Sequence, residues 1–340
     1  MEDKNQELTG YNNKKGLFYI KLHLQKYNLL MDTFIGPSVS SVQKIGITID
    51  FLLCTLKYGA GINDYFQYNF YKRRAIDRKT FIVGRKWIRI IKTCNGTIAQ
   101  PDFDDKSRFN SVFKDFIGRD WIDLDTCTQD EYESFVKRHP VSMRKIKKGS
   151  GGNGIGVYNS ESEFKSLDDL KNKHFILEEL IDQYDDIAEF NPSSVNTLRL
   201  VTIVHGDKVK LMNAVFRTGN GEGCTDNFHH YGLAALIDCK TGLVVTPAVD
   251  KKNNKFYIHP LSRKQIIGYK IPFWDEIVNT VKKAALIRPN VRYVGWDVSL
   301  DKVGNVCIIE GNCASDPDIT QMPDQIGKWP SYSKELEKWF

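Results

Sequence analysis

The 340-residue sequence lacks the features that mark several classes of protein. Its seven cysteines are irregularly spaced, with no CxxC pair and no Cys/His cluster, which fits reduced structural thiols better than disulfides or zinc. The most apolar run, Ile45 to Leu56, is interrupted by Asp50 and is too short to span a bilayer. No secretory signal is visible at the N-terminus, so we expect a cytoplasmic protein.

Internal repeats and long low-complexity segments are also missing. Hydrophobic residues make up 41% of the chain and charged residues 26%, which is the composition of an ordinary globular protein. Helical patterning fills the first 100 residues, and short strands alternate with helices from Phe135 onward. The expected strands are 141–145, 154–158, 174–177, 198–204 and 209–216. These patterns predict an α+β (α/β) fold with a mainly helical N-terminal region.

Positive charge is concentrated in one part of the chain. The net charge is +6, but residues 57–92 alone carry ten Lys or Arg against two Asp, so the rest sums to −2. Tyrosine, phenylalanine and tryptophan residues are interleaved with these charges. Such a stretch could contact an anionic membrane surface or a phosphorylated glycan, and it could equally be a solvated helical face whose aromatic side chains enter the core. Nucleic acid is the weakest option, because zinc-finger spacing and an RNA-binding consensus are absent.

The segment GWDVSLDKVGNVCIIEGN, residues 295–312, predicts a β-hairpin closed by a turn at 301–305. The hairpin would place Asp297 roughly opposite Ile309 or Glu310, with Glu310 and Asn312 on one face. Two carboxylates beside an amide oxygen favour a hard cation such as magnesium or calcium over zinc. The alternative is that Asp297 and Glu310 are surface charges on an ordinary hairpin.

The segment KIKKGSGGNGIGVY, residues 145–158, places five glycines behind three lysines. Glycines let backbone N–H groups approach phosphate oxygens, and a lysine at the end of the preceding strand adds positive charge. The segment is neither a GxxxxGK[ST] loop nor a dinucleotide fingerprint. It therefore predicts phosphate binding of another kind, or else a flexible hairpin turn.

Two further segments carry candidate binding groups. In HFILEELIDQ, residues 174–183, a strand leads directly into Glu178 and Glu179, whose backbone and carboxylates could meet a nucleotide; ordinary helix N-terminal charges are the alternative. In NAVFRTGNGEGCTDNFHHYG, residues 213–232, Arg217 ends a β-like run. Arginine beside a phosphate site can stabilise a transferring phosphoryl group. Metal binding by the adjacent His229 and His230 is disfavoured, because neighbours on a strand point to opposite faces.

Taken in this order, the four segments resemble the ATP-grasp superfamily, and specifically its sugar-transfer-associated family from polysaccharide biosynthesis. The resemblance covers about residues 60–335, and its most specific stretches are 192–199, 216–229 and 295–312. It implies an N-terminal mainly helical basic region over 1–100, an ATP-grasp lid subdomain with the glycine-rich loop over 101–180, and a C-terminal catalytic subdomain over 181–340. Departures from the family pattern are Ile146 where proline is usual and Tyr231-Gly232 in place of a glycine pair.

The resemblance also implies roles for individual residues. It assigns the ATP phosphates to Lys145 and the loop glycines Gly151 and Gly152, the adenine hinge to Glu178, Glu179 and Leu180, and the ribose to Asn196 or Thr197. It assigns magnesium to Asp297, Glu310 and Asn312, the γ-phosphate to Arg217 and Asn227, and the acceptor cleft to Arg199. An earlier lysine that contacts ATP best matches Lys106, with Lys114 as the second choice.

By the same resemblance, the protein would be a magnesium- and ATP-dependent ligase that joins a carboxylate to an amine through an acyl phosphate. The expected substrates are a small-molecule amine or amino acid and a carboxylate-bearing glycan or glycan precursor of a capsule or another surface polysaccharide. Peripheral contact with an anionic membrane or lipid carrier at the inner membrane face is a further expectation. The alternatives are an ATP-dependent sugar kinase and a non-catalytic accessory of a glycosyltransferase.

Overall fold

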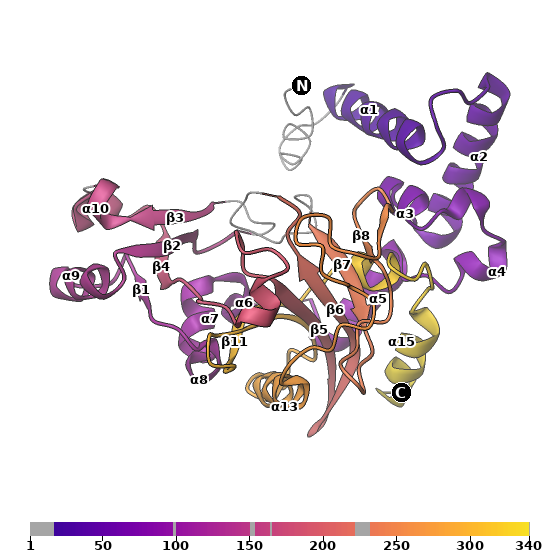
Figure 1. Cartoon of the computed structure of the whole chain (residues 1–340). Coiled ribbons are helices and arrows are strands. Elements are labelled where there is room, and N and C mark those ends of the chain that lie inside the picture. The colour runs from indigo at the N-terminus through magenta and orange to yellow at the C-terminus, as the bar shows by residue number, and fades with distance from the viewer. Residues whose placement is uncertain (1–16, 98–99, 150–153, 164, 222–231, 340) are drawn as a thin grey trace.

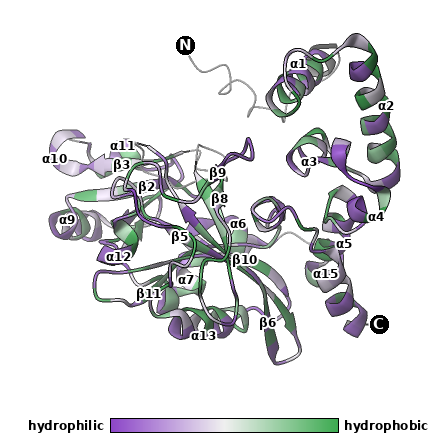
Figure 2. Ribbon diagram, turned by 45° about the vertical axis from the view of Figure 1, so that its right-hand side comes forward, coloured by the Kyte–Doolittle hydropathy of each residue, from purple (hydrophilic) through white to green (hydrophobic). Residues whose placement is uncertain are grey.

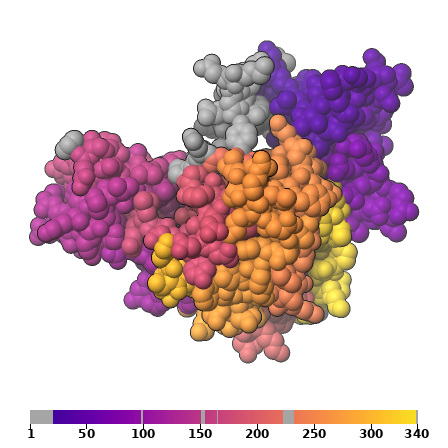
Figure 3. Space-filling view, viewed as in Figure 1, coloured from indigo at the N-terminus to yellow at the C-terminus, as the bar shows by residue number. Residues whose placement is uncertain are grey.

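The computed structural model describes residues 17–97, 100–149, 154–163, 165–221 and 232–339. It contains two separate β-sheets and a group of N-terminal helices (Figure 1). In the space-filling view, the lobe that carries the smaller sheet and the lobe of the N-terminal helices lie on opposite sides of the central sheet (Figure 3). No helix in the described ranges is long and apolar enough to cross a membrane.

Helices fill the described part of the N-terminal region, as the sequence predicts. Helix α2 is a clear case: Ser40 forms a capping box with Gln43 at its start, and Gly59 ends it in the left-handed conformation at φ 75°. Tyr65, Phe66 and Phe70 are fully buried and form the centre of this region's core. The elements are α1 (Leu17–Phe34), α2 (Ser41–Tyr58), α3 (Ile62–Gln67), η3 (Phe70–Lys72), α4 (Ala75–Arg78) and α5 (Gly84–Asn95).

The smaller sheet has four antiparallel strands in the order β1-β4-β2-β3. The glycine-rich segment connects β2 to β3. Gly154 is in the left-handed region at φ 73°, and a Cβ there would lie 2.8 Å from Ile146 Cγ2, so this turn requires glycine. The strands are β1 (Trp121–Asp123), β2 (Val141–Ile146), β3 (Ile155–Asn159) and β4 (Phe175–Glu179). The helices with this sheet are α9 (Gln129–Arg138), α10 (Ser160–Glu163) and α11 (Leu167–Leu170). Helices α6 (Pro101–Asp104), α7 (Lys106–Val112) and α8 (Lys114–Ile117) precede β1 and contact the larger sheet.

The larger sheet has seven antiparallel strands in the order β11-β10-β5-β6-β7-β8-β9. They are β5 (Thr197–His205), β6 (Lys208–Thr218), β7 (Leu233–Ile237), β8 (Ala248–Val249), β9 (Lys255–Phe256), β10 (Tyr293–Leu300) and β11 (Val306–Asn312). The remaining elements are α12 (Asp185–Ala188), α13 (Trp274–Ala285), α14 (Asp318–Gln321), α15 (Trp329–Leu336) and η5 (Glu337–Trp339).

Alternate residues of the larger sheet enter different cores, one on each face. On one face, Leu200, Phe216 and Trp296 pack with α7, α8 and α13. On the other face, Val201 and Tyr293 pack with α5 and α15, while further residues of β6 to β8 pack with the N-terminal helices and α14. The N-terminal region therefore covers part of the second face.

The α+β fold with a helical N-terminal region is confirmed. The predicted hairpin and the five predicted strands are present within one or two residues of the expected bounds. The two sheets lie on either side of residue 180, although the exact division into three domains stays a prediction. The six described cysteines are free thiols, as expected.

Candidate active site

Four neighbouring strands of the larger sheet bring together the residues expected at the phosphates and the metal. Asp297 on β10 pairs in register with Glu310 on β11 and with Arg199 on β5. Arg217 on β6 is opposite Thr197, two residues from Arg199, so its side chain is on the same face. Sequence positions about 100 residues apart thus meet at one end of the sheet.

Asp297 is the centre of this group. Its carboxylate accepts hydrogen bonds from Arg199 Nε and, at 2.9 Å, from Arg199 Nη2, and Arg217 Nη1 lies 3.0 Å from Oδ1. Burial would raise the pKa of Asp297, but the two arginine charges outweigh it and lower that pKa to about 2. Asp297 therefore stays ionised and holds both guanidinium groups in place.

A close approach beside this cluster depends on Gly295. Arg199 Nη1 donates to Ser315 Oγ at 3.1 Å, and both side chains lie over Gly295. A Cβ at residue 295 would be 2.3 Å from Ser315 Oγ and 3.1 Å from Arg199 Cδ. The glycine of the Gly-Trp-Asp segment is thus needed for arginine placement.

Asp297, Glu310 and Asn312 share the face of the hairpin, as predicted. Asn312 Nδ2 donates to Glu310 Oε1 at 3.0 Å, which leaves the other Glu310 oxygen and the amide oxygen of Asn312 as further oxygen donors. Three or more His, Cys, Asp or Glu side chains do not gather as a metal site anywhere in the described ranges. The predicted set has only two carboxylates, but its oxygen-only donors fit a hard cation such as magnesium.

A second buried charge cluster lies in the smaller sheet, around Glu178. Its carboxylate accepts from Asn110 Nδ2 at 2.8 Å, Arg119 Nε at 2.8 Å and Lys145 Nζ at 2.6 Å. Burial would raise the pKa of Glu178, but the charges of Arg119 and Lys145 hold it well below its usual range. Both Glu178 oxygens therefore have protein partners.

Arg119 links the two sheets. Besides binding Glu178, its guanidinium donates to the carbonyl oxygens of Ile308 at 2.9 Å and Ile309 at 3.2 Å on β11. Sequence analysis missed Arg119 and Asn110, since neither is in a recognisable motif. The sequence did offer one signal, because a buried Glu178 carboxylate needs more than one cationic partner.

The basic residues near the glycine-rich segment have distinct positions. Lys145 points toward Glu178, whereas Arg144 pairs with Glu163 at 3.3 Å on the other face of β2. Lys147 is bound by Asp123 and Asp125 at 2.6 and 2.7 Å, which leaves it a structural role. Lys106 Nζ donates to the Gly149 carbonyl at 2.9 Å, so it lies at the start of the glycine-rich segment. Lys114 is exposed on α8.

The remaining predicted ATP contacts are at the C-terminal end of β4 and at the start of β5. Leu180 is 39% exposed just beyond β4, and the backbone N–H of Glu179 donates to Asp120. The Asn196 amide donates to Gln183 and to backbone carbonyls and accepts from Thr218 at 2.6 Å, so it organises the entry to β5. Thr197 is buried. Gly151, Gly152 and Asn227 lie outside the described residues.

Three acidic residues that the sequence analysis did not consider lie beside the arginine cluster. Asp64 comes from α3, Asp316 comes from the loop after β11, and Asp318 is the first residue of α14. Asp316 is exposed, but desolvation by the protein around it, together with the charge of Asp318, raises its pKa to about 7. Desolvation likewise raises the pKa of Asp64 to about 7. The N-terminal region thus contributes a carboxylate next to the catalytic sheet.

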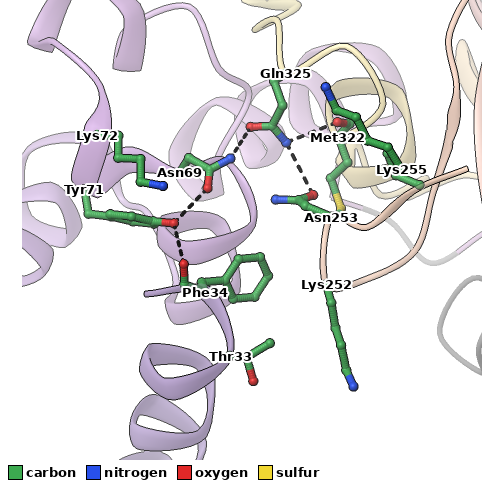
Figure 4. A pocket seen from close by; sticks show the side chains of 11 residues that line it. Thr33, Phe34, Asn69, Tyr71, Lys72, Lys252, Asn253, Lys255, Met322 and Gln325 are labelled. Carbon is green, nitrogen blue, oxygen red and sulfur yellow. Dashed lines mark hydrogen bonds between the residues drawn. The ribbon is translucent and has the colours of Figure 1, made fainter. Parts of the chain in front are cut away.

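A cavity of about 320 Å³ lies where the N-terminal helices meet the β8–β9 connection (Figure 4). Gln325 holds its two sides together, because its side chain accepts from Asn69 at 2.9 Å and donates toward Asn253 at 3.4 Å. Lys72 enters from one side, and Lys252 and Lys255 enter from the other. None of these lysines forms an ion pair with a described carboxylate, so the cavity lining is positive.

Comparison with known proteins settles the family. A family model described as sugar-transfer associated ATP-grasp matches residues 88–335. The chain belongs to this family. The family prediction is therefore confirmed. A comparison with curated proteins finds no match.

Solved structures with a similar arrangement include other ATP-grasp enzymes. The ATP-grasp ligase PsnB complexed with minimal precursor is 12% identical, with a TM-score of 0.46, and the match covers 72% of this chain and 62% of PsnB. N5-carboxyaminoimidazole ribonucleotide synthetase is 10% identical (TM-score 0.40, covering 64% and 46%), and the L-amino acid ligase from Bacillus licheniformis is 13% identical (TM-score 0.38, covering 62% and 40%). The chain thus spans less than two thirds of each of these proteins.

Proposed function

We propose that the protein is an ATP- and magnesium-dependent carboxylate–amine ligase that attaches an amino acid or another amine to a surface polysaccharide or its precursor. The observation that supports this best is the buried Asp297 with Arg199 and Arg217 on adjacent strands. Two fixed guanidinium groups beside an ionised carboxylate suit a reaction in which negative charge moves between phosphate and carbonyl oxygens. The match to a sugar-transfer associated family supports the polysaccharide substrate.

Magnesium fits the donor set of the hairpin. Asp297, Glu310 and Asn312 would hold it through oxygen atoms only, which is the chemistry that magnesium prefers. The ion would supply positive charge to offset the triphosphate. Because Asp297 also orients Arg199 and Arg217, the metal site and the arginines share one carboxylate.

The nucleotide would lie between the two sheets. Lys145 and the glycine-rich segment with Gly151 and Gly152 would contact the phosphates, and Lys106, at the start of that segment, would add a second cation. Since the Glu178 carboxylate is engaged by protein groups, the adenine hinge would depend on the backbone around Glu179 and Leu180. Asn196 or Thr197 would lie near the ribose.

The reaction would proceed in two steps. A carboxylate oxygen of one substrate attacks the γ-phosphorus, the bond to the bridging oxygen breaks, and ADP leaves while an acyl phosphate forms. The amine nitrogen then attacks the carbonyl carbon, phosphate leaves, and the nitrogen loses a proton. Arg217, with Asn227, would stabilise the moving phosphoryl group, and Arg199 would stabilise the oxyanion at the acceptor.

The lysine-lined cavity supports an anionic acceptor. Its volume of about 320 Å³ is at the lower end of the range for ligand pockets, and Lys72, Lys252 and Lys255 would attract carboxylate or phosphate groups. Met322 and Gln325 line the cavity, and the helix before them begins at Asp318, beside the arginine cluster. Helix α14, whose residues are buried, thus connects the cavity lining to the arginine cluster.

Product analysis tests the proposal directly. The purified protein is incubated with ATP, magnesium, a pool of amino acids and a uronic-acid oligosaccharide, and ADP, phosphate and the glycan mass are measured. A ligase releases ADP and phosphate equally, only when the amine is present, and adds an amide-linked mass to the glycan. Release of ADP without phosphate, together with a phosphorylated sugar, would identify a kinase.

Mass spectrometry of the native glycan with and without the protein checks the polysaccharide assignment, and an unchanged glycan would contradict it.

A further inference from the structure

Helix α2 carries apolar side chains on the side that faces away from the protein. Six large hydrophobic residues on it are each at least 53% exposed, and Val42 and Leu56 reach 79% and 70%. Their spacing of three, four, three, one and three positions places all of them on one side of the helix. We call this set the outer stripe: Val42, Ile45, Ile49, Leu52, Leu53 and Leu56.

The opposite side of α2 already has a partner, so the outer stripe is not the face that folds the helix onto the protein. Cys54 is buried, and Ile47, Phe51 and Tyr58 pack against the core of the N-terminal region. Arg78 of α4 binds both oxygens of Asp50 at 2.8 and 2.9 Å and fixes the inner side. A helix that is apolar on two sides needs a second apolar environment.

The position of α2 leaves the stripe accessible. Helix α2 is at the outer edge of the N-terminal helices, away from both sheets (Figure 1). In the hydropathy view, hydrophobic green segments recur along its length at the periphery of the molecule (Figure 2). Leu24 and Leu29 of the neighbouring α1 and Ile76 of α4 are also exposed and extend the apolar surface.

The charges around the stripe are mainly positive. Residues 41–79 contain seven Lys or Arg against three Asp. Two of the three acids are turned to protein groups, because Asp50 pairs with Arg78 and Asp64 accepts from the Gly61 N–H at 2.8 Å. Lys72 lines the cavity, and the other exposed basic residues of this stretch are Lys44, Lys57, Arg74 and Lys79.

We propose that the outer stripe of α2 docks on an anionic lipid bilayer surface, with the helix lying in the interface and the basic residues meeting lipid headgroups. An apolar face that enters the acyl boundary, flanked by lysines, is the arrangement of interfacial helices. A second copy of the chain fits less well, because a symmetric contact would bring the same positive rim together from both sides. The proposal is independent of the ligase reaction and concerns where the enzyme works.

This docking surface differs from the one that the sequence alone suggested. The basic stretch 57–92 was expected to meet anions, with a core-facing alternative left open. Tyr65, Phe66, Tyr68 and Phe70 are buried, and Arg73 donates to the backbone of Tyr68 and Gln325. The aromatic residues of that stretch therefore pack in the core, whereas most of its basic residues are exposed. The proposed apolar contact is on α2 instead.

Flotation of the full-length protein with vesicles tests the proposal. We expect binding to vesicles of phosphatidylcholine and phosphatidylglycerol, and weaker binding to phosphatidylcholine alone. The variant Ile45→Ser, Ile49→Ser, Leu53→Ser should bind at least about tenfold more weakly, because the removed side chains supply the buried apolar area. The matched control is Val245→Ser, Leu261→Ser, Val303→Ser, which removes three exposed apolar side chains from turns and connections outside α2 and should bind like the parent.

Thermal unfolding and nucleotide binding of both variants show whether the fold is intact. Absent vesicle binding by the parent, or equal binding by the stripe and control variants, would overturn the proposal. If the parent does not bind vesicles but forms a dimer, and the stripe variant is monomeric, the stripe binds a second copy of the chain and the proposal is wrong.

The substitution Leu56→Trp gives an independent readout, because none of the six natural tryptophans is on α2. We expect brominated lipids to quench its added fluorescence, and unquenched fluorescence in bound protein would contradict the predicted orientation.

Discussion

At the scale of single residues, the two charge clusters are linked by β11. Glu310 neighbours Asp297 across the hairpin, and Arg119 binds Glu178 in the smaller sheet while its guanidinium reaches carbonyls of β11. A buried carboxylate requires positive partners, and Asp297 and Glu178 each have two. The consequence is that the sheets are held in a fixed relation at the point where ATP is expected.

The proposed metal role of Glu310 leads to a first prediction. Glu310→Gln keeps the shape and the hydrogen bond from Asn312 but removes the charge that would hold magnesium. Removing a residue that hydrogen-bonds to a metal ligand typically lowers metal affinity or activity about 10- to 100-fold. Removing the charge of a ligand itself should lower the rate of ADP release by at least as much. The control is Glu133→Gln on α9, which is exposed and accepts from Gln129. Full magnesium-dependent turnover by the Glu310 variant would refute the assignment.

Arg119 leads to a second prediction, about stability. Arg119→Met leaves Glu178 buried with one cation fewer, and removal of one partner from a buried pair typically costs about 3–5 kcal/mol. Arg138→Met serves as the comparison, because its ion pair with Asp120 at 3.3 Å is exposed and should contribute less than about 1 kcal/mol. Denaturant unfolding measures both. Equal losses of unfolding free energy for the two variants would show that Arg119 does not link the sheets.

At the scale of elements, the sequence predicts the strands and turns that a local residue pattern specifies. The hairpin 295–312 follows from its turn residues and alternation, and the strands on either side of the glycine-rich segment follow from their apolar runs. Strands β1, β8 and β9 were missed, because two or three residues are too short to show a period. Strand β7, Leu233–Ile237, is apolar throughout and buried, so its sequence does not distinguish strand from helix.

The residues that the sequence did not identify depend on contacts between distant segments. Arg119 and Ile308 are separated by 189 positions, and Arg199 and Ser315 by 116. No spacing rule connects such positions, whereas the ATP-grasp motifs are recognisable because each is contiguous. The roles of Asp64 and Asp316 likewise appear only when the N-terminal helices are placed on the large sheet.

The lysine-lined cavity gives a third prediction, which concerns the β8–β9 connection. The variant Lys252→Gln, Lys255→Gln should bind an oligogalacturonate about tenfold more weakly, because the substitutions remove two positive charges from the cavity lining. Its affinity for ATP should not change. The control is Lys283→Gln, Lys334→Gln, which removes two exposed lysines from α13 and α15. Isothermal titration calorimetry at low salt measures both ligands. Unchanged glycan binding would exclude the cavity as the acceptor site.

At the scale of the whole molecule, the N-terminal region and the catalytic sheet are joined through ionisable groups. Asp64 of α3 lies near Asp316 of the loop after β11 and near Asp318 at the start of α14. Lys251 and Arg199 are the neighbouring cations, and Tyr68 lies beside them. The pKa values of all three carboxyl groups are raised, chiefly by desolvation. This junction therefore favours protonated acids, unlike the two ionised clusters of the site.

The junction makes stability depend on pH, which gives the last prediction. Between the ordinary value of 3.8 and the raised pKa of about 7, the folded protein keeps protons on Asp64 and Asp316 that the unfolded chain has released. Stability from these groups is fully present below 3.8 and is lost as the pH rises through about 7. Asp64→Asn can still accept the hydrogen bond from Gly61 and has no charge to lose, so its melting temperature should match the parent at about pH 4 and exceed it at about pH 8. Thermal unfolding of the two proteins across this range measures the difference, and a gap that does not widen with pH would show that Asp64 titrates normally.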